Sequence, residues 1–471
     1  VRFPYQLLAE LIVAGAGVGR GVPSGRTAPV AFVPGNPPGP APGGHGRNAV
    51  LGDTIANLLE WTGYEVTREY YFNDAGRQMR VLGQSVKSRY DQLLNPDMPM
   101  KTIEGPGGVP VTVPESFPDD GYLGEYIIEI AEGLEGNGSG EGADRSDDTF
   151  KQEAEKAIFA EISATLERLG IHMDTYFNEH SLYESGKVWE VVERLRELGF
   201  VYEQDGAVWF KASELGRDQD KVLVKGTGEP TYRLPDIAYH ADKLGRGFDL
   251  AVDIFGADHI ATYPDVLAAL DVLGYDTSKV RVVIYQFVTL VRGGEPVKMS
   301  TRKATYETLD DLLDEVGEDV TRYFFLIRSP NTHLEFDLDA AKEASENNPV
   351  FYPQYAHARI CSIESKAREV GVDFEAEPDL SLLEHESEIG LIKTLLDFPS
   401  VIQDAARAFE PHKVAVYLRE VAVSFTQFYR SCRIIGVESH LGSARMQLAL
   451  AARTVLANGL GVLGISAPER M

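Results

Sequence analysis

Cysteine is scarce in this sequence of 471 residues, which contains only Cys361 and Cys432. The two form no CxxC pair, and no histidine stands beside them in a metal-ligand pattern, which disfavours a disulfide framework and a structural zinc site. The other histidines show no metal-ligand spacing on one helix, so we predict no metal ligands in the chain. Low cysteine content fits a reducing cytosol, and we expect a cytoplasmic protein.

Long apolar runs and an excess of positive charge are also missing. No apolar stretch reaches the roughly 18 residues of a membrane span, and the first residues lack a signal-peptide pattern, so we predict no membrane partner. The net charge of −27 disfavours broad nonspecific nucleic-acid binding, which needs lysine and arginine. From Gly390 onward, however, the chain has nine Lys/Arg and six Asp/Glu, so this region would bind a polyanion more readily than the rest of the chain.

Strand-like and helix-like patterns alternate over most of the chain, which is typical of an α/β protein. From about Asn347, long helix patterns with few glycines predict a separate all-α helical bundle. The predicted fold is a Rossmann-like parallel-sheet domain with an inserted α+β segment, followed by the bundle. Its predicted boundaries are 1–110 and 226–346 for the two halves of the sheet domain, 111–225 for the insertion and 347–471 for the bundle.

The stretch "NPPGPAPGGHGRNAVLGDTIANLLEW", Asn36–Trp61, is a proline- and glycine-rich loop that leads into a helix pattern. Gly43 and Gly44 would let backbone amides approach an anion, and the dipole of a helix beginning near Gly46 or Arg47 would favour negative charge there. The stretch therefore predicts a phosphate-binding loop. From these residues alone, an ordinary Gly/Pro-rich turn is an equally good interpretation.

The stretch "KMSTRK", Lys298–Lys303, follows a strand pattern and "RGGEP". Three cations and a hydroxyl in one loop could stabilise the charge of a triphosphate, above all when that charge develops in a transition state. Taken alone, a basic surface loop is the commoner outcome for such a motif.

The stretch "TYRLPDIAYH", Thr231–His240, places a carboxylate near the start of a predicted helix. If Pro235 opens the helix, Tyr232 sits just before it and Asp236 lies in its first turn. Such an aspartate could bind a guanidinium through two parallel hydrogen bonds. Capping of the helix by Asp236 is the simpler alternative.

The stretch "GADH", Gly256–His259, follows the apolar strand pattern "LAVDIF". Small and polar residues at the carboxyl end of a strand are where an α/β sheet places its ligand. An ordinary strand-to-helix turn remains the alternative.

In this order, the motifs resemble the class I aminoacyl-tRNA synthetases, whose HIGH and KMSK signatures correspond here to "PGGH" and "KMST". Whole segments are similar to the arginyl-tRNA synthetases of that class, and the resemblance extends from about Asn36 to Met471. The segments are "GHGRNAVLGDTIANLLEWTGYEVTREYYFNDAGRQM", "TYRLPDIAYHADK", "GADH", "KMSTRKATYETLDDLLDEVGEDVTRYFFLIRS", "HLEFDLDAAKEASENNPVFYPQYAHARICSI" and "VLANGLGVLGISAPERM".

The resemblance implies a monomeric arginine–tRNA ligase that uses ATP with Mg²⁺, L-arginine and tRNA(Arg), its first step depending on bound tRNA. It implies that the sheet domain is catalytic and that the bundle binds the anticodon. It assigns catalytic roles to His45, Lys298 and Ser300, ATP binding to Gly43, Gly44, His45, Gly256, Asp258, His259, Lys298, Met299 and Ser300, arginine binding to Asn36, Tyr232 and Asp236, and anticodon contacts to Tyr352, Tyr355, Tyr429 and Met471. Without the family, core packing would be the better interpretation of Tyr352 and Tyr355.

The sequence departs from the family pattern near its start. The family usually has a glutamate where Ala31 stands, and a His-Val pair where Pro42 and Gly43 stand. Loss of the histidine removes a donor aimed at the phosphates, and proline offers no backbone N–H in its place. The resemblance also leads us to expect an extra N-terminal domain, of which we identify only a remnant at Val1–Ile12. Because the sequence opens on valine, we expect further sequence upstream.

Three interpretations of these departures stay open. The chain is a truncated true synthetase, a catalytically impaired paralogue that binds tRNA, or a true synthetase whose deduced sequence is altered near its start. The third is plausible because the changes at Ala31, Pro38, Pro42 and Gly43 each need one base substitution; resequencing that confirms these codons would refute it. A cysteine- or methionine-specific synthetase is a more distant rival, since it would show zinc-type cysteine spacing.

Overall fold

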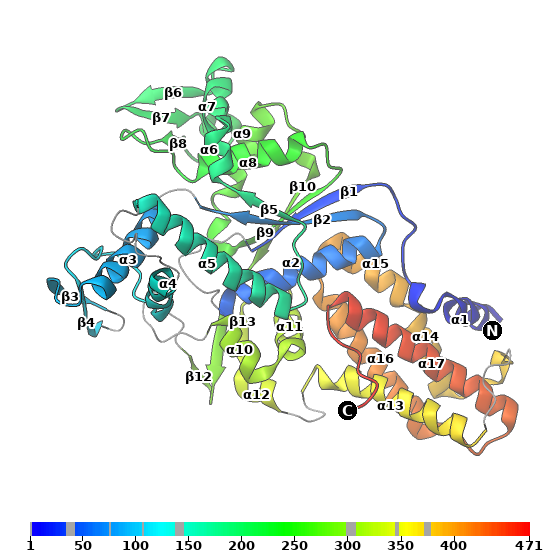
Figure 1. Cartoon of the computed structure of the whole chain (residues 1–471). Coiled ribbons are helices and arrows are strands. Elements are labelled where there is room, and N and C mark those ends of the chain that lie inside the picture. Colours follow the sequence, from blue (N-terminus) through cyan, green and yellow to red (C-terminus); the bar gives the residue numbers. More distant parts are fainter. Residues whose placement is uncertain are drawn as a thin grey trace.

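The computed structural model describes residues 2–33, 43–74, 77–105, 108–136, 146–297, 308–343, 348–371 and 378–471. At its centre lies a five-stranded parallel sheet with the strand order β10-β9-β1-β2-β5 (Figure 1). The strands are β1 (Thr27–Ala31), β2 (Glu65–Phe72), β5 (Thr175–Asn178), β9 (Ala251–Gly256) and β10 (Val280–Tyr285). Parallel strands covered on both faces are rich in apolar residues, and β9 is apolar apart from Asp253. The predicted Rossmann-like sheet is confirmed.

The strand β5 lies within the range predicted as one insertion, yet it pairs with β2 at the edge of the central sheet. The chain therefore leaves the sheet twice between β2 and β9. The first excursion contains α3 (Arg77–Leu94), β3 (Met100–Glu104), β4 (Pro110–Pro114), α4 (Glu125–Gly136) and α5 (Asp147–Arg168). The second contains α6 (His180–Glu184), α7 (Lys187–Glu197), β6 (Val201–Gln204), β7 (Ala207–Phe210) and β8 (Lys221–Val224). The domain boundaries themselves stay a prediction.

Helices and a small second sheet complete this domain. The helices are α2 (Gly43–Trp61), α8 (Arg233–Gly245), α9 (Tyr263–Val272), α10 (Leu309–Val316), α11 (Glu318–Leu326) and α12 (Leu338–Lys342). The small sheet has the order β12-β11-β13, formed by β11 (Val288–Arg292), β12 (Glu295–Pro296) and β13 (Leu334–Asp337). Close packing of α2 against α10 and α11 depends on Gly46, because a Cβ there would lie 2.6 Å from Leu309 and 2.8 Å from Phe325.

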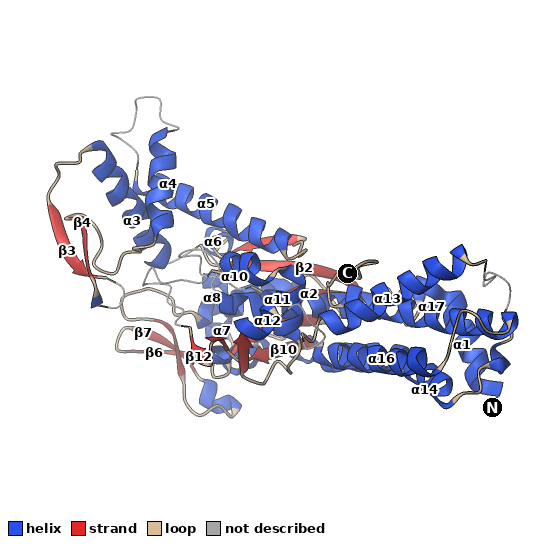
Figure 2. Ribbon diagram, turned by 90° about the horizontal axis from the view of Figure 1, so that it is seen from below, coloured by secondary structure: helices blue, strands red, loops and turns tan. Residues whose placement is uncertain are grey.

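The predicted helical bundle forms a separate lobe at one end of the molecule (Figure 2). It contains α13 (Phe351–Glu369), α14 (Glu386–Leu396), α15 (Phe398–Ala408), α16 (His412–Ser431) and α17 (Ser439–Val462). The first helix, α1 (Arg2–Ala14), packs against α14 and α17 of this lobe, where the Tyr5 hydroxyl donates to the carbonyl oxygen of Leu383 at 2.7 Å. None of the helices in the described ranges is both long enough and apolar enough to cross a bilayer.

One arginine joins the sheet domain to the bundle. Arg322 on α11 has an exposed fraction of 1%. Its guanidinium donates to the carboxylate of Asp53 on α2 (2.6 Å), to the carbonyl oxygen of Leu169 (2.7 Å) and to that of Leu463 after α17 (3.0 Å). Gly464 allows this approach, since a Cβ there would lie 2.1 Å from the guanidinium. Arg322 therefore holds three separate segments together.

We expect Arg322→Met to lower the free energy of unfolding by about 3–5 kcal/mol, because it leaves two buried carbonyl oxygens without a donor and Asp53 with one cation fewer. Arg168→Met is the matched control. Arg168 likewise has three partners, the carboxylates of Asp310, Asp314 and Glu318. These pairs are exposed, so each should contribute about 0–1 kcal/mol to the free energy of unfolding. Urea denaturation gives the free energy of unfolding of both variants, and an equal loss of that free energy in the two would contradict the role of Arg322.

Candidate active site

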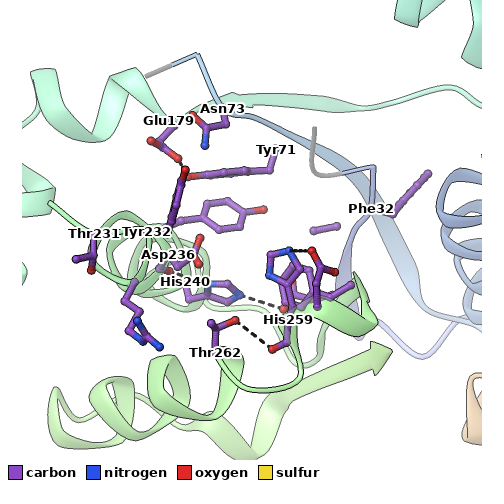
Figure 3. A pocket seen from close by; sticks show the side chains of 16 residues that line it. Phe32, Tyr71, Asn73, Glu179, Thr231, Tyr232, Asp236, His240, His259 and Thr262 are labelled. Atoms are coloured by element: carbon purple, nitrogen blue, oxygen red, sulfur yellow. Dashed lines mark hydrogen bonds and ion pairs between the residues drawn. The ribbon is translucent and has the colours of Figure 1, made fainter. Parts of the chain in front are cut away.

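A cavity of about 390 Å³ opens at the carboxyl ends of β1, β2 and β9 (Figure 3). It lies where the strand order reverses, since β1 has β2 on one side and β9 on the other. This switch point is the usual ligand site of open α/β sheets. The lining of the cavity includes side chains from β1, the end of β2, the residue after β5, α8 and the turn after β9.

The sequence prediction placed Asp236 in the first turn of a helix, and the structure places it in the first turn of α8, beside the cavity. Burial raises the pKa of its carboxyl to about 6, although His240, His259 and Arg233 act to lower it. Within the described residues, no hydrogen bond or ion pair joins the Asp236 carboxylate to another side chain. This carboxylate is therefore open to a cationic ligand.

Glu179 is a second carboxylate of the cavity, and the sequence prediction missed it. It is buried and accepts a hydrogen bond from the Tyr71 hydroxyl at 2.6 Å. Burial raises the pKa of Glu179 to about 7; the bond from Tyr71 acts to lower it, and the negative charge of Asp236 acts to raise it further. A polar residue directly after a strand was the available signal, but β5 was not recognised as a strand of the central sheet.

Aromatic rings form a wall of the cavity between these two carboxylates. The rings of Tyr71 and Tyr239 lie 4.3 Å apart between centroids, and Figure 3 shows Tyr71 on the side of Glu179. The predicted Tyr232 also lines the cavity and is 73% exposed, which places it at the mouth. Two carboxylates that lack a cationic partner in the described structure, set beside aromatic faces, suit a planar cation such as a guanidinium.

A buried charge network lies beneath the cavity and anchors α8 to the sheet. The Lys243 ammonium donates to the Asp253 carboxylate at 2.6 Å, and Nε2 of His240 lies 3.3 Å from the same carboxylate. The Tyr239 hydroxyl donates to Glu69 on β2 at 2.5 Å. Burial acts to raise the pKa of Asp253, but Lys243 and His240 outweigh it and hold that pKa well below its usual range. The network fixes the helix that carries Asp236.

Ala31, the last residue of β1, lies between two members of this network. It is directly opposite Glu69 on β2 and Asp253 on β9 in the sheet, so its side chain points to the same face as theirs. Ala31 also lines the cavity. A methyl group thus borders the cavity at the position where the resemblance leads us to expect a carboxylate.

The predicted residues of the "GADH" turn lie at the end of β9. Asp258 and His259 line the cavity, and the His259 ring stacks on Phe255 with 5.1 Å between centroids. Gly256 does not line the cavity but makes room for the turn, because a Cβ there would lie 2.5 Å from Oδ1 of Asp258. The structure therefore brings two of these three predicted residues to the cavity.

The other predicted residues of the sheet domain lie outside the described part of the chain. These are Asn36, Lys298, Met299 and Ser300; Gly43, Gly44 and His45 begin a described helix, but their surroundings and the His45 side chain lie outside the description. The helix α2 begins at Gly43, a turn earlier than predicted from the sequence. The roles assigned to these residues stay predictions.

The backbone just before the first signature motif is strained. Val33 has a φ of +56°, which is rare for a β-branched residue. Its amide donates to Oδ1 of Asn48 on α2 at 2.7 Å, while Nδ2 of Asn48 donates to the carbonyl oxygen of Ile254 on β9 at 3.0 Å. Asn48 thus ties the ends of β1 and β9 to α2, and strain of this kind is common at functional sites.

A second groove of about 950 Å³ lies in the bundle, between α13, α16 and the end of the chain. Three of the four predicted anticodon residues, Tyr355, Tyr429 and Met471, line it. Tyr352 does not line it and packs against the hydrophobic core instead. The Arg359 guanidinium lies 5.1 Å from the centre of the Tyr429 ring and donates to the Tyr355 hydroxyl at 3.1 Å.

The lining of this groove is strongly basic. As far as the structure describes it, the lining includes no Asp or Glu side chain, and it includes the five cations Arg359, Lys366, Arg430, Arg433 and Arg470. In a chain with a net charge of −27, such a patch is a distinct local feature. Cations beside exposed aromatic rings are suited to phosphates and unstacked bases.

Two family models match the chain. Residues 26–360 match "tRNA synthetases class I (R), catalytic domain", and residues 353–471 match the "DALR anticodon binding domain". The two matches meet within α13, between the sheet domain and the bundle.

Two relatives named arginine–tRNA ligase are similar over nearly the whole chain. One, from Salinibacter ruber, is 61% identical over 467 residues, which cover 98% of this chain and 83% of the relative. The other, from Desulfotalea psychrophila, is 50% identical over 472 residues, which cover 99% of this chain and 82% of the relative.

Solved structures agree with these matches. A structure assigned as an arginyl-tRNA synthetase of Campylobacter jejuni has a TM-score of 0.88 at 30% identity, covering 100% of this chain and 99% of that one. The arginyl-tRNA synthetase of Thermus thermophilus, at 22% identity, shares the fold with a TM-score of 0.77, covering 99% of this chain and 86% of that one. The resemblance predicted from the sequence is confirmed, and the chain belongs to the arginyl-tRNA synthetases, a family of class I aminoacyl-tRNA synthetases.

Proposed function

We propose that this chain is an arginine–tRNA ligase, which activates L-arginine with ATP and transfers it to tRNA(Arg). The observation that carries the proposal is the pair of carboxylates Asp236 and Glu179, which share one cavity at the sheet's switch point and have no bound cation within the described residues. A guanidinium with five N–H donors can satisfy both carboxylates at once. Membership of the family supplies the reaction.

In the proposed reaction, the carboxylate of arginine attacks the α-phosphorus of ATP and displaces pyrophosphate. The product is arginyl adenylate. A hydroxyl group of the terminal adenosine of tRNA then attacks the carbonyl carbon of this adenylate, which forms an ester bond and releases AMP. The chain contributes positioning and charge stabilisation. Asp236, Glu179 and Tyr232 would hold the arginine side chain, and we place ATP beside Asp258 and His259, next to the two signature motifs.

We place Mg²⁺ on the phosphates of the nucleotide. Within the described ranges, no group of three His, Cys, Asp or Glu side chains could hold a metal ion. Mg²⁺ usually keeps several waters and binds through phosphates and one or two carboxylates, so it needs no dedicated cluster of protein ligands.

We assign the anticodon loop of tRNA to the groove of the bundle. Tyr355 and Tyr429 offer stacking faces, and the five cations of the lining offer phosphate contacts. Contacts of this kind make affinity depend strongly on salt. This assignment explains why the positive charge of an acidic chain gathers on its last helices.

A catalytically impaired tRNA-binding paralogue is the second candidate. The methyl group of Ala31 at the cavity favours it, because the resemblance leads us to expect a carboxylate there. The two candidates differ in aminoacylation with radioactive arginine and purified tRNA(Arg). A ligase accumulates arginyl-tRNA over repeated turnovers, whereas the paralogue binds tRNA in a salt-sensitive way and forms none. A chain that does neither would refute both.

The raised pKa values of the two carboxyls predict a pH dependence. A guanidinium binds the ionised carboxylates, so arginine binding is complete above the pKa of Glu179, about 7, and is lost as the pH falls through that value and through the pKa of Asp236, about 6. We expect the KM for arginine to rise about tenfold per pH unit below 7 and more steeply below 6. Steady-state kinetics from pH 5.5 to 8.5 give the KM for arginine. A KM that does not change with pH would contradict the assignment of Asp236 and Glu179 to the arginine site.

A further inference from the structure

The last nine residues of the sequence, 463–471, form a C-terminal tail that follows α17 and is held by hydrogen bonds at three of its residues. Its first residue, Leu463, accepts the hydrogen bond from Arg322. Three residues later, the backbone N–H and the hydroxyl of Ser466 donate to the carboxylate of Asp319 on α11. Nε2 of Gln354 on α13 donates to the carbonyl oxygen of Ser466 at 3.0 Å and to Asp319 at 2.8 Å.

The final tether is His357, also on α13. Its Nδ1 lies 2.9 Å from the carbonyl oxygen of Pro468. A carbonyl oxygen only accepts, so Nδ1 must carry the hydrogen. The ring is buried, and burial lowers the pKa of His357 even though the bond to Pro468 acts to raise it. The imidazole is therefore neutral at pH 7, with a fixed tautomer.

Beyond Pro468 the tail enters the bundle groove. Arg470 and Met471 line that groove together with Tyr355. Tyr355 lies on α13 between Gln354 and His357, so one turn of the helix carries both tethers and one of the stacking rings. Within the described structure, no side-chain hydrogen bond or ion pair involves residues 469–471.

We propose that Gln354 and His357 are positioning residues that set Arg470 and Met471 in the tRNA groove. The proposal rests on the proposed function, which assigns tRNA to this groove. Three residues beyond Pro468 reach at most about 10 Å, whereas five residues beyond Ser466 reach about 17 Å. Loss of the His357 bond therefore enlarges the volume open to Met471 about fivefold, and the contact of Met471 with RNA weakens in proportion.

The test is tRNA binding and kinetics with variants of the full chain. We expect His357→Ala to raise the Kd and the KM for tRNA(Arg) about fivefold, with little change in kcat at saturating tRNA. His357→Asn keeps a donor near the place of Nδ1 and should restore most of the affinity, whereas His357→Gln places its donor near Nε2 and should not. His412→Ala is the control, since this half-buried histidine of the bundle has no hydrogen bond at Nδ1 within the described residues.

A deletion of residues 469–471 separates positioning from general stability. The deletion should raise the Kd for tRNA by at least the same factor, and adding His357→Ala to it should have no further effect. The proposal would be overturned if His357→Ala raised the Kd for tRNA by the same factor in the deleted chain as in the full chain. An unchanged Kd in His357→Ala would also overturn it. Because Kd is measured without turnover, a chain that binds tRNA but transfers no arginine would refute the proposed function and leave this test intact.

Discussion

Replacing Asp236 with asparagine is expected to raise the KM for arginine by roughly 10²- to 10³-fold. The substitution keeps the shape of the side chain but removes the charge that would pair with the guanidinium, and loss of one partner of a buried pair costs about 3–5 kcal/mol. Because Glu179 stays in place, some binding of arginine should survive. Arginine titrations in steady-state aminoacylation give the KM, and the KM for ATP should change little.

The same substitution should not destabilise the free protein. Burial raises the pKa of Asp236, so its ionised form is unfavourable in the folded chain at pH 7, and a neutral amide removes that cost. Thermal unfolding of Asp236→Asn is therefore expected at the same temperature or higher. Asp242→Asn, on the same helix but paired with Lys187, is the control and should leave the KM for arginine unchanged. A KM for Asp236→Asn within threefold of the parent chain would contradict the proposed arginine site.

The combined change of Ala31→Glu, Pro42→His and Gly43→Val is expected to raise kcat/KM by at least 10³-fold. One restored donor to the phosphates in the transition state contributes about 10²- to 10³-fold in rate. A carboxylate at position 31 would join the face of the sheet that carries Glu69 and Asp253, where a hydrogen bond to the ammonium of arginine contributes about 1.5–3 kcal/mol.

Single changes separate these two contributions. Ala31→Glu should act on the KM for arginine, and Pro42→His with Gly43→Val should act on kcat. Ala31→Gln fills the same space without the charge and should give a much smaller gain. A restored chain that is no faster than the parent would show that the missing groups do not limit this enzyme.

Asp236 was predictable because its signal is local: a proline near a helix start followed by an acid in the first turn. Glu179 was not, because its role depends on β5 pairing with β2, more than a hundred residues away in the sequence, and a strand of four residues between amphipathic helices has no periodicity of its own. Tertiary packing determines which strands pair in a sheet, and the spacing of residues along the chain does not reveal that pairing.

The same limit applies to charges and helices elsewhere. The position of Lys243 on α8 gives no sign in the sequence that it is buried. Its side chain is nevertheless fully buried, because its ammonium forms an ion pair with Asp253 on β9. The helix α1 opens the chain but packs on the bundle. Tyr355 and Tyr429 were predicted from the family to share one site, and the structure brings them together, whereas Tyr352, three residues before Tyr355, points into the core.

Arginine-dependent exchange of pyrophosphate into ATP, with and without tRNA(Arg), measures the activation step itself. We expect exchange with the unmodified chain only when arginine and intact tRNA are both present. It should be slower than with the chain restored at positions 31, 42 and 43, and lost at the same arginine concentration in Asp236→Asn. No exchange at all with arginine and intact tRNA would contradict the assignment of this chain as an arginine–tRNA ligase.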